Sequence, residues 1–114
     1  MIYTSSRNSS VGVSAAKAIS QGISEDSGLF VPVSLPILTG NDFGKLKDLN
    51  YIDRAKYVLG KFLDDFTDEE LDRCVTGAYS GNFDDDQPAP LKKLKNNKYM
   101  LELWHGPTCA FKDL

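Results

Sequence analysis

Two consecutive amphipathic patterns in the middle of the chain constrain its fold more than any other feature. Between Tyr51 and Phe66, apolar side chains recur at helical spacing. The next stretch opens with a capping box, in which Thr67 can accept from the Glu70 amide and the Glu70 side chain can reach back. The apolar positions are Ala55, Val58, Leu59, Phe62 and Phe66 in the first pattern, and Leu71, Cys74, Val75 and Ala78 in the second. We therefore predict two adjoining helices, with Cys74 on the buried stripe of the second.

The first half of the chain predicts shorter elements. Residues 1–6 contain β-type side chains, and 29–32 reads as a brief extended run that ends in a proline. Ser14 is suited to cap a helix, and Gly22 is suited to the position just past its end. A further short helical piece is expected after Asn41-Asp42.

The second half of the chain predicts a β-hairpin. Two strand-like runs, 91–95 and 98–104, flank Asn96-Asn97, and asparagines can adopt the positive φ angles of a tight turn. Together with the helices, this predicts an α+β fold: a small domain with a few short strands, a β-hairpin and three to four helices.

A linker separates the two parts of the predicted domain organisation. Residues 84–90 contain three successive aspartates and two prolines, and we interpret them as a solvated linker rather than a cation site. We expect a helical and β domain over 1–83 and a hairpin-containing segment over 91–114. The chain stops at Leu114 as if partway into an element, so truncation is expected.

Composition argues against several classes of protein. The net charge is -3 and no basic face is evident, which argues against binding of nucleic acid. No apolar stretch reaches membrane-spanning length. With two cysteines and one histidine, a Cys and His metal site is not expected. Two cysteines do not make a disulfide framework, and the cytoplasm is the simplest expected location.

The chemically specific residues lie near the C-terminal end. A strand leads into the sharp turn Gly106-Pro107, and Thr108 is suited to cap a helix whose first turn holds Lys112. The field of a helix N-terminus disfavours an ammonium there, and so would desolvation by Ala110 and Phe111. The free amine is the form that attacks an aldehyde to make a Schiff base. These features alone are weak evidence, because many proteins carry a solvated lysine in such a place.

Three segments together resemble the threonine synthases. Gly106-Pro107-Thr108-Cys109-Ala110-Phe111-Lys112-Asp113 is similar to the family's Gly-Pro-Thr-any-Ala-Phe-Lys-Asp. Tyr3-Thr4-Ser5-Ser6-Arg7 is similar to its opening Tyr-any-Ser-Thr-Arg, and Asp26-Ser27-Gly28-Leu29-Phe30-Val31-Pro32 to its Asp-Gly-Gly-Leu-Phe-Val-Pro. The departures are Ser6 for threonine and Ser27 for glycine.

The resemblance implies the N-terminal part of a pyridoxal-phosphate (PLP) enzyme. The full enzyme would have the tryptophan-synthase-β type of fold, and it would convert O-phospho-L-homoserine and water to L-threonine and phosphate. Lys112 would be the catalytic residue and the residue that binds PLP as a Schiff base. His105 and Thr108 are lesser candidates for contacts with cofactor or substrate, against the simpler roles of local hydrogen bonding and helix capping.

The sequence also predicts that this chain is incomplete as an enzyme. It contains no glycine-rich run to cradle the cofactor phosphate, so the remainder of the PLP domain is expected to lie beyond Leu114. We expect the 114 residues alone to be inactive and not to retain PLP. The alternative is a non-catalytic helical and β interaction module that binds no cofactor.

Overall fold

The computed structural model describes residues 1–114, which form four α-helices, four short strands and one 3-10 helix. The α+β prediction is confirmed. The chain divides into two compact units, Met1–Arg73 and Cys74–Leu114. The predicted division into 1–83 and 91–114, with a linker over 84–90, stays a prediction.

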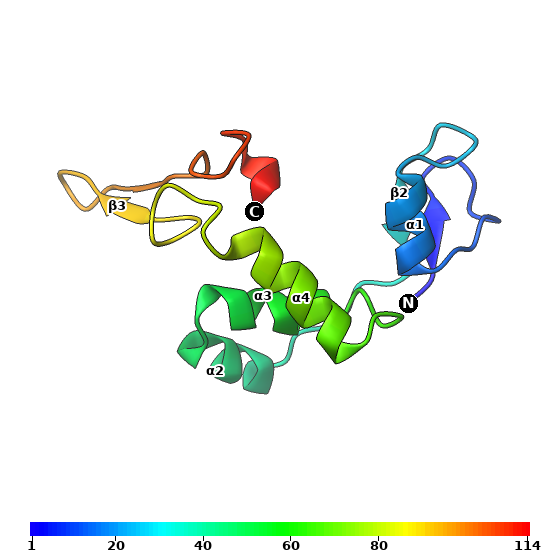
Figure 1. The fold of residues 1–114 in the computed structure, drawn as a ribbon, viewed down its shortest axis with the longest axis horizontal. Coiled ribbons are helices and arrows are strands. Elements are labelled where there is room, and N and C mark those ends of the chain that lie inside the picture. Colours follow the sequence, from blue (N-terminus) through cyan, green and yellow to red (C-terminus); the bar gives the residue numbers. More distant parts are fainter. The chain divides into compact units, whose positions relative to one another are not determined.

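The first unit begins with a two-stranded antiparallel sheet. Strand β1 (Tyr3–Ser5) pairs with β2 (Phe30–Pro32), and Tyr3 lies opposite Pro32. Helix α1 (Ala15–Gln21) lies beside these strands (Figure 1). The Ser14 side chain accepts from an amide in the first turn of α1, as the sequence predicts.

Helices α2 (Gly40–Asp48) and α3 (Tyr51–Leu59) follow and are joined through Arg54. The Arg54 guanidinium donates to the carbonyl oxygens of Leu46 at 3.0 Å and Leu49 at 2.7 Å. These carbonyls lie at the C-terminal end of α2, where the Leu46 carbonyl also accepts from the Leu49 amide at 3.4 Å. One side chain of α3 therefore holds the end of α2.

The prediction that the third helix continues to Phe66 is wrong, because α3 ends at Leu59. Residues 60–66 form turns with local backbone bonds, such as that from the Leu63 amide to the Leu59 carbonyl at 2.9 Å, and some of their polar groups also bond to the N-terminal part of the chain. The Phe62 carbonyl accepts from the Tyr3 hydroxyl at 3.1 Å, and the Asp65 carboxylate accepts from the Ala16 amide at 2.9 Å. Tertiary contacts thus override a local helical pattern.

Helix α4 (Asp68–Tyr79) begins with the predicted capping box. The Thr67 amide donates to the Glu70 carboxylate at 2.9 Å, and the Glu70 amide donates to the Thr67 hydroxyl at 3.2 Å. Leu71 and Val75 are buried, but Cys74 is exposed, so its predicted place in the core is wrong. Residues four apart lie in one line along a helix, and α4 buries only that line rather than the wider predicted stripe.

The second unit contains the predicted hairpin. Strand β3 (Leu91–Lys93) pairs antiparallel with β4 (Tyr99–Leu101), and the turn residues Asn96 and Asn97 have φ angles of 59° and 56°. All strand residues of this hairpin are exposed. A single 3-10 turn, η1 (Phe111–Asp113), follows.

The hydrophobic core is small. No large side chain is fully buried, and the buried apolar residues are Ala15, Ala18, Leu46, Leu71 and Val75. An open, mainly apolar hollow of about 350 Å³ lies between α1 and the strands of the first unit. None of the helices has the length and apolar character needed to span a lipid bilayer.

Candidate cofactor-binding site

Lys112 is the middle residue of η1, and its side chain is exposed. It forms no ion pair and no hydrogen bond, so its amine is accessible to a reagent. Phe111 is 64% exposed and does not provide the expected desolvation. In this chain the lysine side chain is therefore exposed and lacks the apolar cover that the sequence predicts.

The prediction that Thr108 caps the helix carrying Lys112 is wrong. The residue before η1 is Ala110, which has no side-chain capping bond, and Cys109 has a positive φ of 55°. Thr108 instead donates to Asp113, from its amide at 2.9 Å and from its hydroxyl at 2.7 Å. The loop is therefore closed by a carboxylate at its far end rather than by a threonine at its start.

Gly106 makes this loop closure possible. A β-carbon at this buried position would lie 2.5 Å from the Asp113 β-carbon and 2.6 Å from a carboxylate oxygen. The Cys109 amide donates to the Gly106 carbonyl at 3.0 Å and completes the turn. The first and last residues of the octet therefore pack against each other.

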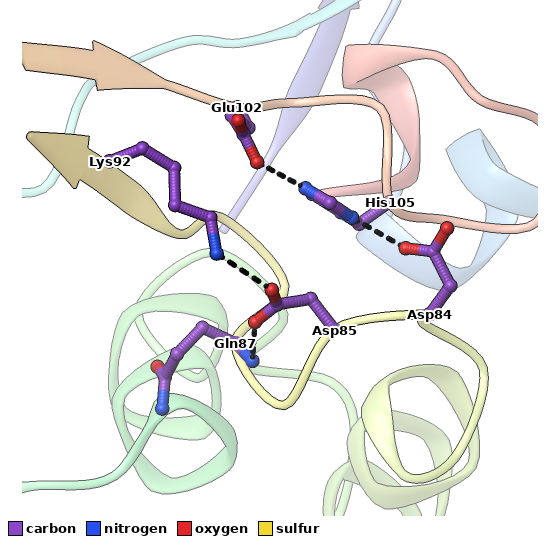
Figure 2. Close-up of polar contacts among 6 residues, drawn as sticks. All are labelled: Asp84, Asp85, Gln87, Lys92, Glu102 and His105. Carbon is purple, nitrogen blue, oxygen red and sulfur yellow. Dashed lines mark hydrogen bonds and ion pairs between the residues drawn. The ribbon is translucent and has the colours of Figure 1, made fainter. Parts of the chain in front are cut away.

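His105 lies between two carboxylates (Figure 2). Its Nδ1 atom is 2.5 Å from Asp84, and its Nε2 atom is 2.8 Å from Glu102. Hydrogen bonding to Glu102, followed by that to Asp84, raises the pKa of the imidazole above its usual 6.5. The Trp104 ring stacks beside it, with ring centroids 5.7 Å apart. Both ring nitrogens thus have partners within the chain.

The acidic segment is bonded to the hairpin rather than free in solvent. Asp85 accepts from Lys92 of β3 at 3.0 Å and from the Gln87 amide at 3.0 Å (Figure 2). The Asp84 amide donates to the His105 carbonyl at 3.0 Å. No group of three or more His, Cys, Asp or Glu side chains is arranged to hold a metal ion.

The two N-terminal motifs, 3–7 and 26–32, meet in space, which the sequence analysis did not predict. Ser5 is buried, with 3% of its surface exposed. Its hydroxyl donates to Asp26 at 2.7 Å, and the Gly28 amide donates to the same carboxylate at 2.9 Å. The Ser5 hydrogen bond, followed by that from Gly28, lowers the pKa of Asp26. The signal in the sequence was a serine and an aspartate in two separate motifs, since both residue types form side-chain hydrogen bonds.

Comparisons with known proteins point to one family. Residues 2–79 match the family model described as threonine synthase N terminus. The chain is 39% identical over 102 residues to a threonine synthase of Haemophilus influenzae, and 36% identical over 114 residues to that of Schizosaccharomyces pombe. These matches cover 89% and 98% of this chain, and 22% of each relative.

Solved structures agree with this assignment. The fold superposes on the crystal structure of PLP-bound threonine synthase from Brucella melitensis with a TM-score of 0.86 and 34% identity. That match covers 99% of this chain and 24% of the solved chain. The protein spans under a quarter of the length of these relatives and aligns with them along nearly all of its own length. The chain therefore belongs to the threonine synthase family, as its N-terminal region.

Proposed function

We propose that these residues supply the PLP-binding lysine of a threonine synthase, and that this lysine is Lys112. The observation that carries the proposal is the octet 106–113, which forms an exposed, closed loop with the lysine amine free of partners. The PLP-bound state of the Brucella relative supports the choice of cofactor.

The proposed reaction converts O-phospho-L-homoserine and water to L-threonine and phosphate. PLP, when bound, supplies a ring that stores the electrons of successive carbanions. Lys112 would hold the cofactor covalently until the amine of the substrate displaces it. The freed lysine amine would then move protons at the α and β carbons of the substrate. The substrate is thus a small phosphorylated amino acid.

Within residues 1–114 the fit to PLP is partial. Lys112 provides the amine, but no glycine-rich helix start lies in the loop to receive the cofactor phosphate. The one glycine of the octet, Gly106, is buried beneath Asp113. We therefore propose that the 114 residues alone neither retain PLP nor turn over substrate, and that the remaining groups come from a longer polypeptide.

Borohydride trapping tests the role of Lys112. The longest polypeptide encoded by the reading frame that contains these residues is incubated with PLP, reduced, digested and mapped by mass spectrometry. We expect one dominant label, at Lys112, which disappears in Lys112→Ala. Lys95→Ala removes another exposed lysine, in the hairpin turn, and should leave the label intact. Scattered labelling of many lysines would favour the non-catalytic interaction module.

Phosphate release tests the reaction itself. We expect the longer polypeptide to release inorganic phosphate from O-phospho-L-homoserine with PLP present, and the 114-residue chain to release none. Turnover by the 114-residue chain would contradict the proposed division of the site. We also propose a cytoplasmic location, which fractionation of the source cells would test; the two free cysteines are compatible with a reducing compartment.

A further inference from the structure

We propose that Asp113 is a positioning residue for Lys112. By accepting hydrogen bonds from Thr108, Asp113 fixes the loop that carries the lysine. This inference rests on the proposed function and extends it, because it gives a role to the carboxylate next to the lysine. It also assigns Thr108 to the loop rather than to the cofactor or substrate.

The first argument is the bonding pattern. The Asp113 carboxylate accepts from the amide of Thr108 at 2.9 Å with one oxygen and from its hydroxyl at 2.7 Å with the other. Both oxygens of one carboxylate are thus bound by one residue five positions earlier in the chain. Hydrogen bonds to an ionised acceptor are stronger than bonds between neutral groups, so this pair is a firm closure of the loop.

The second argument is the space made for that carboxylate. Gly106 is buried, and any β-carbon there would overlap Asp113. The hydrogen bond from the Thr108 side chain, followed by that from its amide, lowers the pKa of Asp113, so the carboxylate is ionised at neutral pH. The glycine, the threonine and the aspartate of the octet therefore form one closely packed unit, and the aspartate directly follows the lysine in the chain.

The third argument is the weakness of the lysine's own turn. Helix η1 has three residues, and its capping residue Ala110 has no side chain that caps it. So short a turn is not stable by itself, since each ordered residue gains little hydrogen bonding in return. Asp113 is the last residue of η1, and Lys112 precedes it directly. Fixing the Asp113 side chain therefore fixes the backbone from which the lysine extends.

The test uses the longest polypeptide of this reading frame. Thr108→Val keeps the shape of the side chain and removes the hydroxyl donor, whereas Thr108→Ser keeps the donor. Asp113→Asn removes the charge at constant size, and Asp86→Asn is the control, since Asp86 is exposed and has no partner. Two quantities are measured: hydrogen exchange at the Thr108 amide without PLP, and the yield of borohydride label at Lys112 with PLP.

We expect Asp113→Asn to raise the exchange rate and to lower the label yield by about tenfold, the effect of one weakened charged hydrogen bond. Thr108→Val should follow it, and Thr108→Ser should resemble the unmodified protein. If Asp113→Asn fails to fold, the comparison of Thr108→Val with Thr108→Ser still tests the positioning role. Equal labelling of the valine and serine variants, with normal labelling of the unmodified protein, overturns the positioning role alone. Absence of label in the unmodified protein overturns the proposed function and this inference with it.

Discussion

The Nε2 atom of His105 lies 2.8 Å from a carboxylate oxygen of Glu102, three residues earlier in the chain. Because Asp84 occupies the other ring nitrogen, the imidazole can donate from both nitrogens only when it is protonated. This arrangement joins the acidic segment to the residues that follow β4 and lead into the Lys112 loop.

His105 should titrate above pH 6.5, because both carboxylates favour the imidazolium. A pKa that is raised in the folded state gives stability that is fully present below pH 6.5. That stability is lost as the pH rises through the folded-state pKa. Since His105 is the only histidine, an NMR titration of its ring protons follows this group without ambiguity.

Two substitutions of glutamate by glutamine test the cause of the raised pKa of His105, one beside the imidazole and one elsewhere. Glu102→Gln should bring the pKa of His105 back toward 6.5, because it removes the larger of the two causes. Glu69→Gln, at an exposed position in the first turn of α4, should leave it unchanged. Titration of the unmodified protein at or below 6.5 would show that the two carboxylates do not hold the ring as described.

Ser27→Gly should stabilise the protein by about 1 kcal/mol, because a left-handed backbone costs a side chain roughly that much and costs glycine nothing. Ser27 has a φ of 63° in the turn before β2. Chemical denaturation gives the free energy of unfolding. The family motif has glycine at this position, so the structure explains what the departure costs.

Ser20→Gly is the control for that measurement. Ser20 lies within α1, where glycine costs about 0.5 kcal/mol of helix stability relative to serine. The two substitutions of serine by glycine should therefore have opposite signs. If Ser27→Gly destabilised the protein, the contacts of the serine side chain would contribute more to the free energy of unfolding than the strained backbone costs.

Gly28→Ala should destabilise the first unit by roughly 1–3 kcal/mol, the usual range for forcing an extra carbon into a filled site. A β-carbon there would lie 2.0 Å from the Ser5 hydroxyl oxygen and 3.1 Å from the Arg7 amide nitrogen. Gly44→Ala in α2 is the matched control, since no atom lies within 4 Å of its added carbon. Thermal unfolding of both variants measures the difference, and Gly44→Ala should be neutral or stabilising.

Cys74 should react with a thiol reagent as readily as Cys109, without denaturant, because both are exposed. Reaction of a cysteine with an aromatic disulfide releases a coloured aromatic thiolate. The rate of its release, measured on the folded and on the unfolded protein, reports the accessibility of the thiol. Cys74→Ser and Cys109→Ser identify which thiol reacts. A Cys74 that reacts only after unfolding would restore its predicted place in the core.

Local signals predicted most of the elements. The Ser14 and Thr67 caps and the Asn96-Asn97 turn depend on bonds or φ angles within a few residues, and the structure confirms them. The wrong predictions about the fold concern features that depend on contacts between residues far apart in the sequence. The third helix ends at Leu59, and the turn that follows it bonds to Tyr3 through the Phe62 carbonyl, a contact that no periodicity in the sequence records.

The candidate site divides in the same way. The motif around Lys112 makes this lysine the proposed cofactor residue, which stays a prediction, whereas capping preferences gave Thr108 the wrong partner. Threonine commonly caps a helix, whereas here a carboxylate five residues later accepts both of its donors. The pairing of Ser5 with Asp26 spans 21 residues, so pattern analysis of either segment alone does not reveal it.

The exposed hairpin has a consequence for behaviour in solution. A sheet of two strands leaves backbone donors and acceptors unpaired along both of its edges, and such edges recruit strands from other molecules. Lys93, Lys95 and Lys98 lie in or beside these strands, and none is in an ion pair. Their mutual repulsion between copies should keep the chain dispersed in dilute buffer, and added salt should weaken that protection by screening it.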